Sequence, residues 1–177
     1  AKDISWRSSD TSAWASQVIK HNGKYYLYFC TWDKTSSGKQ SIGVAVSDSP
    51  TGPFKDIGTP LVKGTLTEPQ SSNWNDIDPT VWVETVDGVE HRYLAWGNGI
   101  FYVCELNDDM ISVKDLDNDG SITMGKDLQR LLGFIVSKMQ TEITQVNIIC
   151  SVLSVGVSKW VTQHQIQCTV LGHGAAL

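Results

Sequence analysis

Short apolar stretches alternate with turn residues between residues 14 and 106, a pattern typical of antiparallel β-strands. The pattern predicts two successive sets of three strands, at residues 16–20, 24–31 and 40–47, then at 80–85, 91–96 and 100–106. Hairpin turns are expected at three pairs whose residues tolerate a positive φ: Asn22-Gly23, Asp87-Gly88 and Asn98-Gly99. Up-and-down sheets of this kind, arranged radially, form the blades of a β-propeller. The predicted fold is therefore all-β and consists of about two blades of a propeller. Two blades alone would not form a closed propeller.

The composition of the chain changes near Lys126. Residues 1–126 contain 28 of the 33 charged residues and 14 of the 16 aromatic residues, whereas residues 127–177 contain 5 and 2. The later segment also lacks a regular hydrophobic period. We therefore expect a partial propeller domain over residues 1–126 and a separate tail over residues 127–177.

Charge and cysteine content argue against several functional classes. The 14 basic and 19 acidic side chains give a net charge of −5 without a Lys/Arg cluster, so neither a nucleic acid nor a membrane is expected as a partner. The four cysteines include no C-x-x-C pair, which predicts buried free thiols rather than a zinc site or a disulfide framework. The seven tryptophans favour sugar binding, because aromatic faces pack on the apolar faces of sugar rings.

Five segments carry a family resemblance. They are AWASQV at 13–18, NGKYYLYF at 22–29, VAVSDSPTGPF at 44–54, NDIDPTVW at 75–82 and YLAWGN at 93–98. Together they resemble glycoside hydrolase family 43, in the branch of arabinofuranosidases and β-xylosidases, over about residues 4–114. The resemblance implies a five-bladed β-propeller that binds its sugar at the central axis.

The resemblance implies inverting hydrolysis, in which one carboxylate activates water, a carboxylic acid protonates the leaving oxygen, and a third carboxylate orients that acid and raises its pKa. Asp78, in NDIDP, matches the third carboxylate and is the predicted catalytic residue of this chain. An aspartate before proline is also common in turns, which is the alternative for Asp78. Asp76 is expected to be a turn residue or a group that supports the site.

The resemblance also implies the residues that line the sugar pocket. Trp14 matches a tryptophan that forms an apolar platform beneath the sugar, with a buried tryptophan between blades as the alternative. Ile77 falls where relatives place a residue of the same pocket. Trp74, Trp96 and Asn98 are further candidates for the cleft, with core packing as an equal alternative.

The other two carboxylates of the family have no match. Nothing before Trp14 resembles the A-D-P-S segment that carries the base, so the chain is expected to begin at the second blade, and no Glu-x-Pro-Trp follows Leu106 to supply the acid. Codons permitted for residues 128–136, read in a displaced frame, spell T-E-A-P-W-I-Y-R, the missing acid segment. The same frame continues into GKYYLFCAFGW and TSDSMYGPW, which repeat residues 23–33 and 46–54 as another blade would. We therefore expect the tail to be an out-of-frame translation without a native fold, the alternative being a genuine apolar tail.

An acidic segment at residues 115–127 resembles a calcium-binding loop. Asp115, Asp117 and Asp119 match positions 1, 3 and 5 of an EF-hand loop. Position 12, which should be acidic, is Lys126, and no helical pattern precedes the loop. Calcium binding and a solvated acidic loop are both retained as interpretations, and no other cofactor is expected.

The functional hypothesis is a fragment of an inverting, exo-acting glycosidase that removes arabinofuranosyl or xylosyl units from arabinoxylan or arabinan of the plant cell wall. The fragment is expected to be inactive alone. A carbohydrate-binding propeller without catalysis is the alternative, and a calcium-dependent docking module would need a second loop that the sequence lacks. The resemblance suggests a secreted or bacterial cell-envelope protein, a cytoplasmic location remaining open, since no signal-peptide pattern or long apolar run is present.

Overall fold

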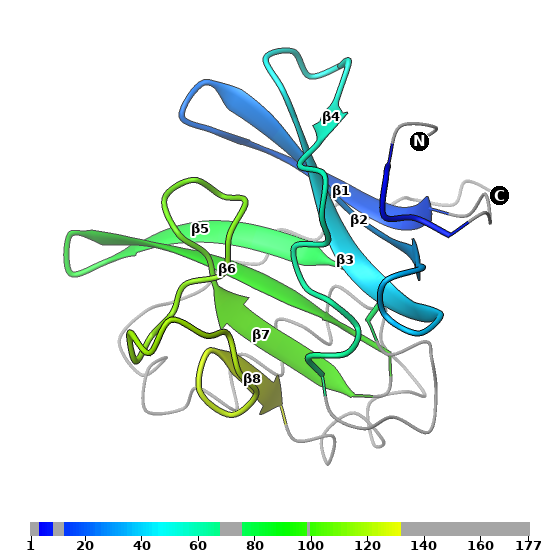
Figure 1. Ribbon diagram of the computed structural model, residues 1–177. Coiled ribbons are helices and arrows are strands. Elements are labelled where there is room, and N and C mark those ends of the chain that lie inside the picture. Colours follow the sequence, from blue (N-terminus) through cyan, green and yellow to red (C-terminus); the bar gives the residue numbers. More distant parts are fainter. Residues whose placement is uncertain (1–3, 9–12, 68–75, 99, 132–177) are drawn as a thin grey trace, which may run out of the picture. The chain divides into compact units, whose positions relative to one another are not determined.

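The computed structural model describes residues 4–8, 13–67, 76–98 and 100–131. Within these ranges the chain forms two four-stranded antiparallel sheets (Figure 1) and no helix, hence none long and apolar enough to cross a membrane. The first sheet has the order β1 (Ala13–His21), β2 (Lys24–Asp33), β3 (Lys39–Ser47) and β4 (Lys55–Asp56). The second has the order β5 (Thr80–Val86), β6 (Val89–Gly97), β7 (Phe101–Glu105) and β8 (Leu128–Leu131). The predicted all-β fold with two successive up-and-down sheets is confirmed.

Two tight hairpin turns have the predicted geometry. Asn22 and Gly23, between β1 and β2, have φ values of 45° and 78°, and Asp87 and Gly88, between β5 and β6, have 51° and 80°. Positive φ at both central residues is the type I′ geometry, which matches the right-handed twist of the flanking strands. The third predicted turn includes Gly99, which lies outside the described residues, although β6 and β7 do pair as antiparallel neighbours.

The sequence pattern does not predict the fourth strand of either sheet, β4 or β8. β4 is two residues long and pairs with Ala45 and Val46 of β3. β8 pairs with residues 101–104 of β7, so residues 128–131, which the composition assigns to the tail, form the edge of the second sheet. The rest of the tail, residues 132–177, lies outside the described residues, and the absence of a native fold there stays a prediction.

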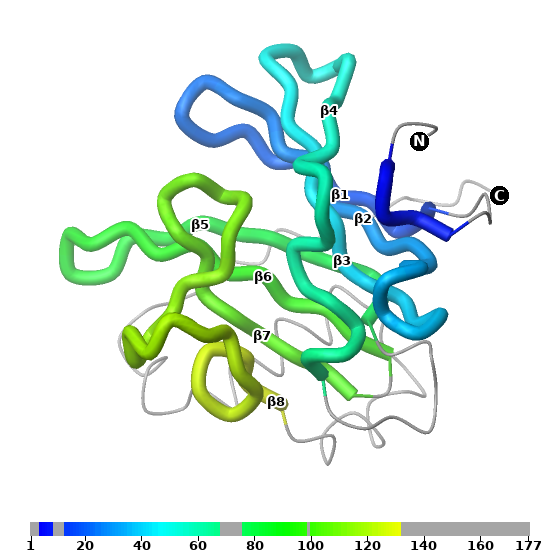
Figure 2. The backbone as a smooth tube through the Cα atoms, viewed as in Figure 1, coloured from blue at the N-terminus to red at the C-terminus, as the bar shows by residue number. Residues whose placement is uncertain are grey.

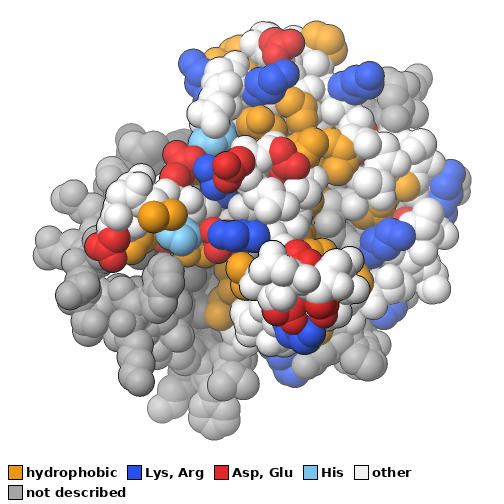
Figure 3. Space-filling model, turned by 60° about the vertical axis from the view of Figure 1, so that its left-hand side comes forward, with side chains coloured by type: hydrophobic (Ala, Val, Ile, Leu, Met, Phe, Trp, Pro, Cys, Tyr) orange, Lys and Arg blue, Asp and Glu red, His pale blue; other side chains and the backbone are white. Residues whose placement is uncertain are grey.

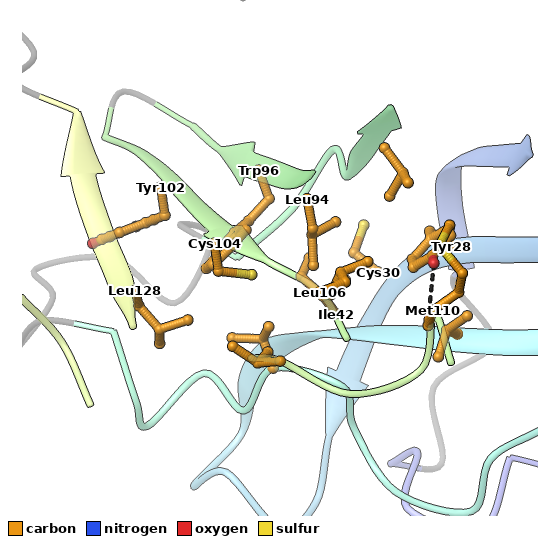
Figure 4. Packing of buried hydrophobic residues seen from close by; sticks show 14 of the residues in the cluster. Tyr28, Cys30, Ile42, Leu94, Trp96, Tyr102, Cys104, Leu106, Met110 and Leu128 are labelled. Carbon is orange, nitrogen blue, oxygen red and sulfur yellow. Dashed lines mark hydrogen bonds between the residues drawn. The ribbon is translucent and has the colours of Figure 1, made fainter. Parts of the chain in front are cut away.

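One hydrophobic cluster contains buried side chains from both sheets (Figure 4). Alternate residues of β2, β3, β6 and β7 contribute to it, because successive side chains of a strand point to opposite faces. Its fully buried members include Tyr28, Ile42 and Val44 of the first sheet and Leu94, Trp96 and Tyr102 of the second. The Tyr28 hydroxyl donates to the Met110 carbonyl oxygen at 2.6 Å, so its polar atom is satisfied inside the cluster. Burial holds the pKa of Tyr28 well above its ordinary value.

The N-terminal segment at residues 4–8 packs on the other face of the first sheet (Figure 2). Trp6 stacks on Phe29 with ring centroids 6.0 Å apart, and its Nε1 donates to Asp56 Oδ2 at 3.1 Å. A Cβ built on Gly43 would lie 2.5 Å from the Phe29 ring and 2.8 Å from that of Trp6. Glycine at position 43 therefore allows both rings to lie flat on the sheet.

The loop between β2 and β3 is organised by a buried carboxylate. Asp33 accepts hydrogen bonds from Thr35 N at 2.7 Å, Thr35 Oγ1 at 2.7 Å, Ser36 Oγ at 2.5 Å and Ser41 Oγ at 2.8 Å. Burial raises the pKa of Asp33, but the hydrogen bonds from Ser36, Thr35 and Ser41 together outweigh it and leave the pKa below its ordinary value. The loop is thus held in one shape by an ionised group.

Candidate active site

Trp14 and Asp78 approach the same buried thiol. Trp14, at the start of β1, lies opposite Cys30 in the strand register, and Cys30 Sγ donates to the Trp14 carbonyl oxygen at 3.5 Å. The pKa of Cys30 is raised to about 11, with burial as the largest cause; a hydrogen bond with the Asp78 backbone lowers this pKa and the Asp78 carboxylate raises it. Both interactions require Asp78 to be near the thiol. The start of β1 and the segment that leads to β5, from different sheets, therefore meet at Cys30 through their backbones, and Trp14 and Asp78 are both partly exposed.

Each of these two strand starts contains a residue in the left-handed backbone region. Ala15, directly after Trp14, has a φ of 48°, and Asp78 has a φ of 57°. Residues other than glycine rarely adopt this conformation, and aspartate tolerates it better than alanine does. Unusual backbone conformations of this kind concentrate at functional sites.

A β-bulge near Trp14 changes which side chains of β1 face inward. Trp14 pairs with Cys30 and Gln17 pairs with Tyr28, so three steps along β1 correspond to two along β2. Without a bulge, residues three apart would point to opposite faces of a strand. Trp14 and Gln17 are both half-buried, whereas Ala15 and Ser16 between them are exposed. The bulge thus turns Gln17 toward the second sheet.

Gln17 bonds to the first strand of the second sheet. Its Oε1 accepts a hydrogen bond from Val81 N at 2.6 Å, and its Nε2 donates to Val81 O at 3.1 Å. Val81 follows Asp78 by three residues, as Gln17 follows Trp14 by three. The two candidate residues are therefore linked through this pair as well as through Cys30.

The segment that leads to Asp78 is fixed from within the second sheet. The carboxylate of Asp76 is 1% exposed and accepts hydrogen bonds from Trp96 Nε1 at 2.7 Å and Thr67 Oγ1 at 2.9 Å. The Ile77 carbonyl oxygen accepts a hydrogen bond from Gly97 N at 2.8 Å. Asp76 thus has the supporting position that the sequence suggests for it.

The remaining predicted pocket residues are dispersed. Trp96 is 1% and Ile77 8% exposed, and both belong to the hydrophobic cluster between the sheets. This placement favours the packing alternative for Trp96 and sets Ile77 beneath the surface that carries Asp78. Asn98 is exposed at the end of β6, and Trp74 lies outside the described residues. The structure therefore brings the backbones of Trp14 and Asp78 to Cys30. The sequence does not single out Cys30 or Gln17, the residue that bonds to Val81.

A hollow elsewhere on the first sheet does not include these residues. It has a volume of about 630 Å³ and is lined mainly by the ends of β2, β3 and β4, including Lys24, Val46, Asp48, Lys55 and Ile57. Among the described residues, its lining includes no aromatic side chain and neither Trp14 nor Asp78, so those residues offer no ring on which a sugar could stack.

In the predicted calcium loop, the ammonium group of Lys126 forms ion pairs with two of the carboxylates. Carboxylate oxygens of Asp115, Asp117 and Asp127 lie within 4.8 Å of one another. Lys126 Nζ lies 2.6 Å from Asp117 Oδ2 and 2.8 Å from Asp119 Oδ2. Hydrogen bonds with these two carboxylates hold the pKa of Lys126 above its ordinary value, and the one with Lys126 holds that of Asp119 below it. Figure 3 shows acidic and basic side chains intermingled on the face it presents. Asp119 is thus paired with an ammonium, and calcium binding stays a prediction.

Residues 1–139 match the family described as Glycosyl hydrolases family 43. Over 98 residues the chain is 41% identical to Xylosidase/arabinosidase 43A of Humicola insolens, an alignment that covers 54% of this chain and 25% of that protein. Over 111 residues it is 30% identical to an extracellular endo-α-(1→5)-L-arabinanase of Thermotoga petrophila, which covers 55% of this chain and 23% of the relative. The chain thus spans about a quarter of the length of these curated relatives.

A solved structure supports the same assignment. An α-L-arabinofuranosidase from Clostridium thermocellum ATCC 27405 is 34% identical and superimposes with a TM-score of 0.52, covering 73% of this chain and 37% of the other. The described residues of this chain form two four-stranded antiparallel sheets. Because the family match covers most of the chain and the fold agrees with it, the chain belongs to glycosyl hydrolases family 43 and forms part of that family's five-bladed β-propeller.

Proposed function

We propose that this chain is part of the catalytic domain of a glycosidase that hydrolyses the O-glycosyl bonds of arabinan- or xylan-type carbohydrates. The observation that carries the proposal is that the backbones of Trp14 and Asp78, which belong to the starts of two different sheets, both contact the thiol of Cys30. Their side chains, an aromatic ring and a carboxylate, are the two groups that a sugar ring requires, one for its apolar face and one for its hydroxyl groups or a neighbouring acid. The names of the curated relatives favour the same substrates.

Trp14 and Asp78 have different roles in this proposal. Trp14 stacks beneath the sugar unit whose bond is cleaved. Asp78 orients the general acid and, through its negative charge, favours the protonated form of that acid. Neither residue activates water or protonates the leaving oxygen, so both remaining carboxylates of an inverting mechanism must come from other segments.

We infer further that the enzyme is exo-acting and releases single arabinofuranosyl or xylosyl units. Identity does not separate the two modes of action, because the chain is 41% identical to the xylosidase/arabinosidase of Humicola insolens and 39% identical to an endo-arabinanase of Bacillus subtilis. The inference rests instead on the five sequence segments that resemble the branch of arabinofuranosidases and β-xylosidases. Aryl glycosides of the two sugars are therefore suitable substrates, because an exo-acting enzyme needs only one sugar unit and a leaving group.

The 177-residue chain alone is expected not to hydrolyse them. A longer version, termed here the completed protein, carries an upstream A-D-P-S segment and the T-E-A-P-W reading of the tail, and is expected to turn over an aryl arabinofuranoside or xyloside with inversion at the anomeric carbon. Each missing group costs on the order of a hundredfold in rate. Turnover by the 177-residue chain would contradict the assignment of the missing groups. Sugar binding without turnover by the completed protein would instead favour the carbohydrate-binding alternative.

A further inference from the structure

The side chain of Gln17 covers part of the free edge of β5. Val81 lies opposite Leu94 of β6, and its own N–H and C=O are both bonded to the Gln17 amide, at 2.6 and 3.1 Å. A primary amide offers one acceptor and donors in the same arrangement as a peptide group. Gln17 therefore satisfies two backbone groups that another strand would otherwise pair with.

This contact joins strands that share no backbone pairing. β1 and β5 belong to different sheets, and the core between those sheets consists of apolar side chains, which attract without fixing register. Two hydrogen bonds to one residue are directional and fix the position of β1 along β5. A slip of one residue would move Asp78 by about 3.3 Å relative to Trp14.

We propose that Gln17 is a positioning residue for sugar binding: through Val81 it holds Trp14 and Asp78 at the separation that one sugar ring requires. This inference rests on the proposed function, in which these two residues address the same sugar. Gln17 itself contacts the backbone of Val81 rather than the sugar. The thiol of Cys30 also lies between the two segments, but its 3.5 Å bond to Trp14 O involves a weak S–H donor and sets register less strictly.

The test uses the full 177-residue chain and a matched pair of substitutions. Gln17→Met keeps the length of the side chain and removes both hydrogen bonds. Gln129→Met makes the same change on β8, where the Gln129 amide donates to the Lys126 carbonyl oxygen at 2.6 Å, away from the candidate residues. Binding of methyl α-L-arabinofuranoside and methyl β-D-xyloside is measured by NMR titration, and stability by urea unfolding.

Gln17→Met is expected to weaken binding of the preferred sugar by roughly tenfold or more, whereas Gln129→Met leaves it unchanged. Gln17→Glu, which keeps the acceptor for Val81 N and loses the donor, should fall between them. Unchanged sugar affinity in Gln17→Met, or equal losses in both methionine variants, would overturn the inference.

A separate outcome concerns the proposed function. If the wild-type chain binds neither sugar, the proposed site fails for this chain, and positioning is read from the unliganded protein. Loss of the Gln17 amide must then shift the resonances of both the Trp14 indole N–H and the Asp78 backbone amide relative to Gln129→Met. A change confined to Val81 would show that Gln17 only covers a strand edge.

Discussion

The indole nitrogen of Trp96 donates a hydrogen bond to Asp76 Oδ1 at 2.7 Å, and both residues are 1% exposed. The other carboxylate oxygen of Asp76 accepts a hydrogen bond from Thr67 at 2.9 Å. Trp96 lies on β6, next to β5 in the sheet, and Asp76 precedes Asp78 by two residues. The segment that carries Asp78 is therefore anchored, through this pair, to the buried interior of the second sheet.

Replacing Asp76 tests this anchor. Asp76→Ala leaves the buried indole N–H without its partner and is expected to lower the free energy of unfolding by about 2–4 kcal/mol. Asp76→Asn keeps an acceptor for Trp96 and should cost about 1 kcal/mol. Urea unfolding of the full chain measures both. The control is Asp48→Asn, whose carboxylate is 90% exposed in an ion pair with Lys24 and whose loss costs about 0.5 kcal/mol or less. A similar loss for Asp76→Ala and Asp48→Asn would contradict the anchoring role.

Local sequence signals account for the six longest strands and the two type I′ turns. Short apolar stretches bounded by turn residues mark these strands, and Asn22-Gly23 and Asp87-Gly88 have the positive φ values that their residue types favour. β4 and β8 carry no such signal, because a strand of two to four residues is too short to show a period. Their formation depends on the neighbouring strand offering a free edge.

The candidate site can be predicted from the sequence only where a motif marks it. Trp14 and Asp78 are found through their family segments, and their proximity follows from the order of the blades. Gln17 is different: without the bulge at Ala15 it would be assigned to the wrong face, and a bulge has no local sequence signature here. Trp96 could not be placed from the sequence, since an aromatic residue at the end of a strand can line a cleft or pack in the core. Its buried hydrogen bond to Asp76 places it in the core.

Acidification should lower the free energy of unfolding, because Asp33 becomes protonated. The pKa of this carboxyl is lowered in the folded protein, so the unfolded chain takes up a proton first as the pH falls. Its stabilising contribution is therefore complete above about pH 5 and is lost progressively below about pH 4. In urea unfolding at several pH values, Asp33→Asn should be markedly less stable than wild type near neutral pH. The difference between their free energies of unfolding should become smaller in acid. Asp48→Asn serves as the exposed control, and a gap independent of pH would contradict the prediction.

Lys126 is expected to limit calcium binding by the loop at residues 115–127. Its ammonium lies 2.6 Å from Asp117 Oδ2 and 2.8 Å from Asp119 Oδ2, and Asp117 belongs to the group of carboxylates that could hold a cation. Lys126→Gln removes this competitor and should increase the rise in melting temperature that millimolar Ca²⁺ produces, because a ligand that binds the folded state stabilises it according to its affinity. Lys24→Gln, which removes an exposed lysine paired with Asp48, is the control. Equal responses of wild type and Lys126→Gln would show that Lys126 does not limit calcium binding.

Asp78→Asn separates catalysis from folding in the completed protein. Asn tolerates the left-handed conformation that Asp78 adopts at a φ of 57°, so the blade should keep its stability within about 0.5 kcal/mol. The amide carries no charge to favour protonation of the acid or to orient it, so kcat on an aryl glycoside should fall by roughly a hundredfold. Asp87→Asn is the matched control, because Asp87 has a similar φ of 51° at an exposed turn, and it should leave kcat unchanged.

The pH profile of the Asp78→Asn enzyme adds a second readout. Loss of the neighbouring negative charge lowers the pKa of the acid, so the fall in activity on the alkaline side should move to lower pH. An Asp78→Asn enzyme with wild-type kcat and an unshifted alkaline limb would exclude Asp78 as the orienting carboxylate.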